Sequence, residues 1–285
     1  MKTHQIISGG LTLALHEFAH NPDAPQVLYL HGATFPAMLS IGFRFDGFSW
    51  ADDLAQVGFG VWGLDFAGYG ESERYRDGEF GDSADVLDQI SAAISVIGSK
   101  SLSIIAHSWG TVAAGRYVAE NPGHVDRLVL FGPIARRFGG EDRNVISPTR
   151  QVTIKDQYTR FVADVPPDEP PILSDRHFAT WADAYLNSDP DARVNNAVTV
   201  PAGPAREIGD VWRGHFPYDP EQISIPTLIV RGEWDSLSND QDAAWYSSGL
   251  CNAPAQDIII PKATHLMHLE SGRFGLYEAT RDFLR

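Results

Sequence analysis

The sequence has little of several things, and each shortage narrows what the protein can do. Its 285 residues include a single cysteine, Cys251, so no disulfide can form within the chain. Basic residues are outnumbered by acidic ones, 22 against 37, which gives a formal charge of −15. This balance disfavours nucleic acids and anionic membranes as partners, because both are bound mainly through clustered Lys and Arg.

Long hydrophobic runs are also missing. No segment reaches the roughly 18 uninterrupted apolar residues that a membrane-spanning helix needs. The N-terminus carries one Lys and a short apolar stretch broken by Gly9-Gly10, which argues against a secretory signal. We therefore expect a cytoplasmic protein without a membrane partner, whose oligomeric state the sequence leaves open.

Short apolar runs of strand length are present, and they are continuous rather than alternating. Such runs are typical of strands covered on both faces, as in a parallel sheet. They lie at 27–30, 61–64, 102–105, 128–131, 228–230 and 258–260, after two short strands within 6–18. Helical patterns at 83–97, 109–120 and 274–284 alternate with them. The predicted fold class is α/β, with a mostly parallel, doubly wound sheet.

The alternation stops between Pro133 and Pro226, where no strong strand run occurs and proline, aspartate and aromatic residues accumulate. Helical spacing remains there, as in Phe178, Trp181 and Tyr185, so we expect a mainly helical insertion after the sixth strand. Its acidic residues, Glu207 among them, are expected to be mostly solvated. Any that line an entrance would favour neutral or cationic substrates.

One strand leads directly into a helix through a serine with small residues two positions away on either side. The segment is Ala106-His107-Ser108-Trp109-Gly110. A turn this tight strains its central residue and brings backbone close to the flanks, which must therefore be small. The pattern predicts a nucleophile elbow centred on Ser108. The alternative is that Ser108 merely caps the following helix.

A serine nucleophile needs a histidine base, and the histidine needs a carboxylate to orient it. Asp235 follows the strand run at 228–230, and His265 follows the run at 258–260. Glu233 and His268 are the nearby rivals for these two roles. We predict that Ser108, Asp235 and His265 act together.

The developing oxyanion needs two hydrogen-bond donors. One predicted donor is the backbone N–H of Trp109, at the start of the helix behind the serine. The other is expected after the first long strand, from Ala33 or, second, Thr34. His31 in the same segment is expected to be structural or to contribute to the pocket.

Together these residues resemble the α/β-hydrolase family, and the resemblance also covers Asp65-Phe66-Ala67-Gly68-Tyr69-Gly70-Glu71-Ser72, a loop that shapes the sheet and pocket in that family. The resemblance implies a core at 1–133 and 221–285, with residues 134–220 forming a helical cap or lid. The elbow is similar to that of proline iminopeptidases, although their Gly-rich oxyanion loop is replaced here by His31-Gly32-Ala33-Thr34. A serine at the elbow argues against the aspartate-based dehalogenases and epoxide hydrolases of the family.

The chemistry expected is hydrolysis of a carboxylic ester or lactone of a small, partly apolar molecule, through an acyl-enzyme. An amidase or aminopeptidase, a carbon–carbon bond hydrolase and a ligand-binding receptor are the alternatives. The residues proposed to line the pocket are His31, Phe35, Phe138, Trp181, Tyr185, Trp212 and Trp234. No cofactor is expected.

The run His16-Glu17-Phe18-Ala19-His20 matches the H-E-x-x-H pattern of zinc proteases. That chemistry requires a helix, which places both imidazoles on one face. Here the preceding residues alternate as a strand and Asn21-Pro22 follows at once. We therefore predict no metal site, and interpret the segment as an exposed strand end.

Overall fold

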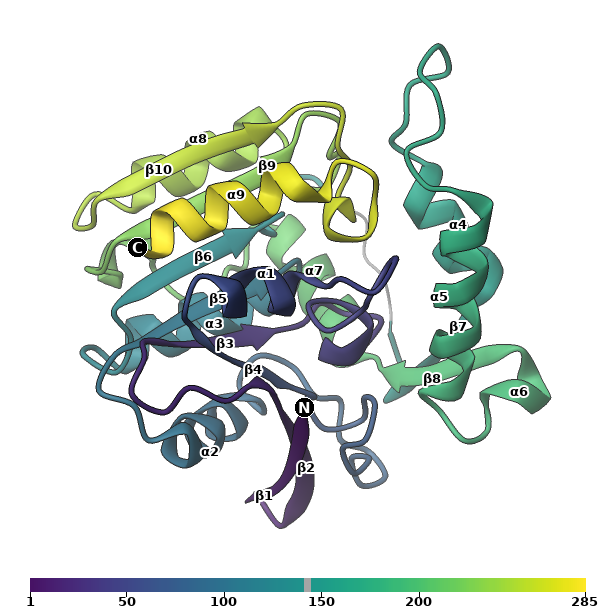
Figure 1. Cartoon of the computed structure of the whole chain (residues 1–285), viewed down its shortest axis with the longest axis horizontal. Helices are drawn as coiled ribbons and strands as arrows, with labels where there is room; N and C mark the ends of the chain where they lie inside the picture. The colour runs from purple at the N-terminus through teal and green to yellow at the C-terminus, as the bar shows by residue number, and fades with distance from the viewer. Residues whose placement is uncertain (141–144) are drawn as a thin grey trace.

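The computed structural model describes residues 1–140 and 145–285, and its main sheet has eight strands in the order β1-β2-β4-β3-β5-β6-β9-β10 (Figure 1). The strands are β1 (Lys2–Ser8), β2 (Leu11–Ala19), β3 (Gln26–Leu30), β4 (Gly60–Leu64), β5 (Leu102–His107), β6 (Arg127–Phe131), β9 (Thr227–Gly232) and β10 (Ala255–Ile260). β2 pairs antiparallel with β1 and β4, and all other neighbours are parallel. The predicted α/β class with a mostly parallel sheet is confirmed.

Helices cover both faces of this sheet. α1 (Trp50–Gln56) and α9 (Arg273–Leu284) pack on one face, and α2 (Leu87–Ile97), α3 (Gly110–Glu120) and α8 (Asp240–Gly249) pack on the other (Figure 1). Side chains along β3 alternate between the two layers: Tyr29 contacts the α1 side, and Leu28 and Leu30 contact the α3 side. Apolar contact on both faces explains why these strands read as continuous apolar runs.

Two helices of the core were not predicted, and one begins later than expected. α1 is only seven residues long, and α8 buries Asp242 as well as Ala243 and Tyr246, so neither has a clear apolar stripe. α2 begins at Leu87 rather than Ser83, and it ends at Gly98 as predicted, with φ of +62°. Left-handed backbone of this kind is the usual helix stop for glycine.

The insertion between β6 and β9 is mainly helical, and most of it stands beside the sheet, toward the right of Figure 1. Its elements are β7 (Thr149–Thr153), α4 (Ile154–Val162), α5 (Asp175–Asn187), α6 (Ala192–Asn195), β8 (Ala197–Pro201) and α7 (Gly203–Trp212), followed by the 3-10 turn η2 (Pro220–Gln222). β7 and β8 form a two-stranded antiparallel ribbon that was not predicted, because β7 is polar and largely exposed. We call the insertion the cap; its predicted limits of 134–220 stay a prediction.

The cap contacts the core through several segments, α7 and α5 among them. α7 approaches the loop before α2, where the Gly203 N–H donates to the Phe80 carbonyl at 2.8 Å. α5 approaches the short turn η1 (Ala37–Leu39), where the Trp181 indole N–H donates to the Leu39 carbonyl at 2.9 Å. Within the described residues, the structure has no helix long and apolar enough to cross a bilayer.

Candidate active site

Ser108 lies between the end of β5 and the start of α3, and its backbone is left-handed. Its φ of +55° is unusual for a residue with a side chain and costs on the order of 1–3 kcal/mol. Two backbone hydrogen bonds hold it: the Ser108 N–H donates to the Phe131 carbonyl at 3.0 Å, and the Thr111 N–H donates to the Ser108 carbonyl at 2.9 Å. The geometry is that of a strained strand-to-helix turn.

Small residues around Ser108 allow this turn. A Cβ added to Gly110 would lie 2.5 Å from the backbone oxygen of His31, and one added to Gly32 would lie 3.1 Å from the Ser108 Cβ. Ala106 is fully buried beneath the turn. The close approach of the Gly32 loop to the serine therefore accounts for the small residues that the sequence shows at these positions.

Asp235 and His265 lie together on the loops that follow β9 and β10. The His265 Nδ1 is 2.9 Å from Asp235 Oδ2 and 3.1 Å from Oδ1, and both residues are buried. Asp235 Oδ1 also accepts from the backbone N–H groups of Leu237 and Ser238, at 2.8 and 3.0 Å. These bonds fix the carboxylate, so that it can orient the Nδ1–H of the imidazole.

The carboxyl of Asp235 is held in its ionised form. Burial alone would raise its pKa, but the charge and hydrogen bond of His265 and the N–H of Leu237 lower the pKa below its ordinary value. With Nδ1 facing this carboxylate, Nε2 is the nitrogen left to accept a proton. Nε2 is buried and has no hydrogen-bond partner within the described part of the chain.

Two neighbours of Ser108 contact His265. His107, directly before the serine, has its Nε2 3.1 Å from the His265 carbonyl, and the two rings are 5.0 Å apart. Gly132, directly after Phe131, has a φ of +54°, and a Cβ there would lie 3.0 Å from the His265 ring and 3.2 Å from Asp235 Oδ2. β5, β6, β9 and β10 are consecutive in the sheet, so their carboxyl ends bring these groups to one edge.

The rival residues lie in other environments. Glu233 is exposed, and its Oε2 accepts from the Lys262 backbone N–H at 2.8 Å. His268 lies in the turn η3 (Met267–Leu269) and is buried, with its ring 4.7 Å from that of His107. Neither ring nitrogen of His268 has a hydrogen-bond partner among the residues described.

The predicted oxyanion donors belong to the two segments that meet at Ser108, the start of α3 and the Gly32 loop. Trp109 is the N-cap residue of α3, and Ala33 and Thr34 follow β3. In residues 1–140 and 145–285, neither the Trp109 N–H nor the Ala33 N–H donates to a protein acceptor. The Tyr69 hydroxyl donates to the Ala33 carbonyl at 3.0 Å and so fixes this segment.

His31 is held by backbone on both ring nitrogens. The Phe66 N–H donates to His31 Nε2 at 3.1 Å, which makes Nδ1 the protonated nitrogen, and Nδ1 lies 2.7 Å from the Gly32 carbonyl. Burial lowers the pKa of His31, with smaller opposing effects from Asp65 and the Gly32 carbonyl. The ring therefore acts as a neutral brace for the Gly32 loop.

The residues proposed for the pocket separate into two groups. Phe35, Trp181 and Tyr185 are buried together: the Phe35 and Trp181 rings are 5.2 Å apart and those of Trp181 and Tyr185 are 5.1 Å apart. Phe35 also contacts the rings of His107 and His268, at 6.4 and 6.1 Å. These contacts connect α5 of the cap to the residues around Ser108.

The other pocket candidates are not joined to this aromatic cluster. Phe138 is 78% exposed and packs beside Gly214. Trp212 is half-buried under the guanidinium of Arg137, and Trp234 is half-buried in the loop before Asp235. A cavity of about 830 Å³ lies on another side of α5, beside Phe18, Met38 and Phe43; none of Ser108, Asp235 and His265 lines it, so it lies apart from the catalytic candidates.

Sequence reasoning missed three buried polar groups near the site. Glu207 of α7 accepts from the Trp109 indole, and Glu270 accepts from the backbone and hydroxyl of Thr264, next to His265. His107 belongs to the elbow motif, but nothing in that motif indicates that its side chain contacts the loop of His265. The contacts of Glu207 and Glu270 depend on packing between distant segments, for which the sequence carries no local pattern.

The H-E-x-x-H segment is part of β2, as predicted, and therefore lacks the helical geometry of the zinc motif. The interpretation as an exposed strand end is wrong for its first half. His16 is fully buried and its Nε2 is 2.9 Å from Asp65, while Glu17 is buried and pairs with His4 and His20. Asp65 also accepts from the Ala37 N–H at 2.9 Å, so these residues brace the loop after β4.

Comparison with known proteins agrees with this geometry. Residues 25–272 match the family model described as alpha/beta hydrolase fold. The chain belongs to this family. Among curated proteins it is similar to Epoxide hydrolase 3 of Mus musculus, at 26% identity over 80% of the chain, and to AB hydrolase superfamily protein YisY of Bacillus subtilis strain 168, at 25% identity over 80% of the chain. The match spans 62% of the mouse protein and 80% of the bacterial one.

Solved structures show the same alpha/beta hydrolase fold. A meta-cleavage product hydrolase from Pseudomonas fluorescens IP01 superposes with a TM-score of 0.70 at 16% identity, covering 98% of this chain and 96% of that one. A serine hydrolase from Cycloclasticus zankles gives 0.71 at 18% identity, covering 99% and 97%. Similarity at this level of identity establishes the fold and leaves the substrate to be argued from the site.

Proposed function

We propose that this alpha/beta hydrolase is a serine hydrolase that cleaves a carboxylic ester or lactone of a small, partly apolar molecule. The observations that carry the proposal are the left-handed elbow at Ser108, whose neighbour His107 contacts His265, and the buried carboxylate that orients His265. His265 Nε2, which has no hydrogen-bond partner among the described residues, is the group that would take the serine proton. We propose that the only partner the reaction needs is its small-molecule substrate, and that it uses no cofactor.

The reaction proceeds in two stages. The Ser108 Oγ attacks the carbonyl carbon while its proton passes to His265 Nε2, and the carbonyl oxygen becomes an oxyanion facing the N–H groups of Trp109 and Ala33. Collapse of this intermediate breaks the bond to the leaving alkoxide, which takes the proton from His265. Water then attacks the acyl-enzyme, again through His265, and releases the acid and Ser108.

The residue at the elbow supports an acyl-enzyme over epoxide chemistry. The curated relative from mouse is named an epoxide hydrolase. Enzymes of that kind in this family use an aspartate at the elbow, whereas this chain has Ser108 there. A serine hydroxyl forms an ester with a carbonyl carbon, so carbonyl substrates fit this residue best.

The surroundings of the nucleophile support a small, partly apolar substrate. Ser108 is only 8% exposed. Trp181 and Tyr185 of α5 pack in an aromatic cluster with Phe35, whose ring contacts that of His107, next to the serine. Apolar walls with few polar groups favour substrates that bind mainly by burying apolar surface. Glu207, one of the acidic cap residues that could have favoured an amine-bearing substrate, instead accepts hydrogen bonds from Ser83 and Trp109.

Reaction with a fluorophosphonate probe tests the mechanism. The wild-type chain should be labelled, and Ser108→Ala should lose labelling completely and lower kcat on p-nitrophenyl esters by at least about 10³-fold. Ser103→Ala changes a buried serine on β5, the strand that leads into the elbow; it is the matched control and should be labelled like the wild type. A wild-type chain that is not labelled would indicate a binding protein instead of an enzyme.

A substrate comparison tests the bond type. We expect turnover of p-nitrophenyl acyl esters and lactones to exceed that of aminoacyl anilides. Robust hydrolysis of the anilides alone would show an aminopeptidase and overturn the ester assignment. Cleavage of a vinylogous diketone without ester cleavage would show a carbon–carbon bond hydrolase.

A further inference from the structure

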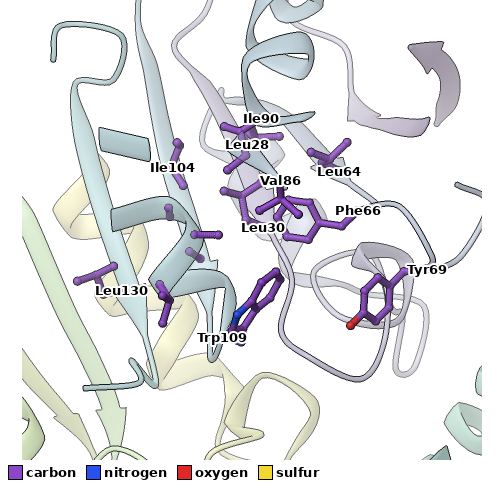
Figure 2. Packing of buried hydrophobic residues seen from close by; sticks show 14 of the residues in the cluster. Leu28, Leu30, Leu64, Phe66, Tyr69, Val86, Ile90, Ile104, Trp109 and Leu130 are labelled. Atoms are coloured by element: carbon purple, nitrogen blue, oxygen red, sulfur yellow. The ribbon is translucent and has the colours of Figure 1, made fainter. Parts of the chain in front are cut away.

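The side chain of Trp109 is bound by the cap. Its indole N–H donates to Glu207 Oε2 at 2.7 Å, and Glu207 belongs to α7. Trp109 is fully buried, and its ring meets that of Phe66 at 5.7 Å on the side of the core shown in Figure 2. The residue whose backbone N–H faces the oxyanion is therefore fixed at its far end by a carboxylate from the cap.

Glu207 is also bound to the core through Ser83. The Ser83 N–H donates to the same oxygen, Oε2, at 3.1 Å, and the Ser83 hydroxyl donates to Oε1. Arg116 of α3 in turn donates to the Ser83 hydroxyl at 3.2 Å. The carboxylate thus accepts three hydrogen bonds from core residues. These bonds hold it against the elbow.

This arrangement matters because the elbow is strained. A left-handed Ser108 persists only where surrounding contacts hold both of its neighbours in place. On one side the Ser108 N–H is held by Phe131. On the other side Trp109 directly follows Ser108, and rotation of the peptide between them would turn the donor N–H away from the oxyanion. Anchoring the indole resists that rotation.

We propose that Glu207 is a positioning residue, which holds the Trp109 indole so that the Trp109 backbone N–H points at the developing oxyanion. The inference rests on the proposed function and adds a specific role for the cap in it. In this proposal the packing of α7 on the core completes the oxyanion site, rather than only covering it. Loss of the carboxylate should therefore weaken transition-state binding more than substrate binding.

Three variants separate positioning from cap docking. Glu207→Gln keeps an oxygen at the Oε2 position for Trp109 and Ser83, and Glu207→Leu removes all three bonds. Trp109→Phe removes the indole donor together with part of the buried ring, leaves the two Ser83 bonds to Glu207 available, and serves if Glu207→Leu fails to fold. Arg206→Gln is the matched control, because Arg206 precedes Glu207 on α7 and binds core Asp82 at 2.9 Å without touching the elbow.

The first measurement is steady-state kinetics on a p-nitrophenyl ester. Glu207→Leu and Trp109→Phe should lower kcat about tenfold with KM within twofold, since a misaimed donor costs less than the roughly 10²–10³-fold of a deleted one. Glu207→Gln and Arg206→Gln should stay within about twofold of the wild type. Equal losses in Glu207→Leu and Arg206→Gln, or a change in KM alone, would overturn the positioning role.

The second measurement uses a trifluoromethyl ketone and its carbinol. Ser108 Oγ adds to the ketone carbon, the proton moves to His265, and the former carbonyl oxygen becomes an oxyanion; the carbinol forms no such adduct. Glu207→Leu should weaken ketone binding about tenfold and carbinol binding less than twofold. Parallel losses would indicate a structural role. Failure of the wild type to react with either the ketone or a fluorophosphonate would instead overturn the proposed function, and this inference with it.

Discussion

The two flanks of Ser108 are built differently. On the elbow flank, the buried polar groups of Ser83, Trp109 and Glu207 hydrogen-bond to one another. On the histidine flank, His107 Nδ1 and both ring nitrogens of His268 are buried without a partner among the described residues. One flank is a closed set of hydrogen bonds, and the other contains polar atoms that cost free energy to bury.

The two flanks also differ in how their titratable groups respond to burial. Burial lowers the pKa of His107 and His268 well below the ordinary value, with added effects from neighbouring imidazoles, so both rings stay neutral. Burial raises the pKa of Glu270 to about 7, although its bonds to Thr264 act against this. Glu207 on the elbow flank has a raised pKa as well, but three donors oppose the burial effect. The pH response of the fold should therefore come mainly from the histidine flank.

The largest expected effect is that of Glu270→Gln. A carboxyl whose pKa rises from 4.5 to about 7 on folding stabilises the protein fully below pH 4.5, and this stabilisation is lost as pH rises through 7. The wild type should lose on the order of 3 kcal/mol of unfolding free energy across this window relative to Glu270→Gln. Urea unfolding from pH 4.5 to 7.5 measures the difference. Parallel curves for the two chains would contradict it.

The elbow flank should respond to shape rather than to pH. A Cβ at Gly110 would lie 2.5 Å from the His31 carbonyl oxygen, so Gly110→Ala must move the start of α3 away from the Gly32 loop. We expect a loss of about 1–3 kcal/mol in unfolding free energy, equal at pH 5 and pH 7.5. Gly209→Ala, where a Cβ has open space, is the matched control. If the loss of unfolding free energy in Gly110→Ala varied strongly with pH, the elbow flank would respond to pH as the histidine flank does, and the proposed difference between them would be wrong.

The smallest expected effect is that of His268→Leu. Removing two unpartnered buried nitrogens should leave stability at pH 7.5 unchanged or raise it by about 1 kcal/mol. Because the pKa of His268 is lowered on folding, protonation of the unfolded chain destabilises the wild type as pH falls below 6.5. The variant should therefore lose less stability between pH 6.5 and 5. A steeper acid loss in the variant would show that the ring has a partner that the present geometry does not contain.

The sequence predicts those parts of the candidate site that short local patterns mark, and not those that depend on packing between distant segments. Ser108, Asp235 and His265 each follow an apolar strand, so short patterns were enough to predict them as a set, and parallel strand order brings such positions to one edge. Glu207 carries no local pattern; it lies among other acidic residues of the cap, and only packing of α7 on the core selects it. The ribbon of β7 and β8 was not predicted for the same reason: β7 is polar, and the two segments are strands because they pair with each other.

The insertion of the cap has a consequence for how the protein folds. β6 and β9 are neighbours in the sheet, yet residues 132–226 separate them along the chain. Pairing across such a distance is slow, because loop closure must precede the contacts that reward it. Ser108 precedes this connection, and Asp235 and His265 follow it. Under the proposed mechanism, reactivity toward a fluorophosphonate appears only after β9 and β10 have joined the sheet, and its recovery during refolding would time that step.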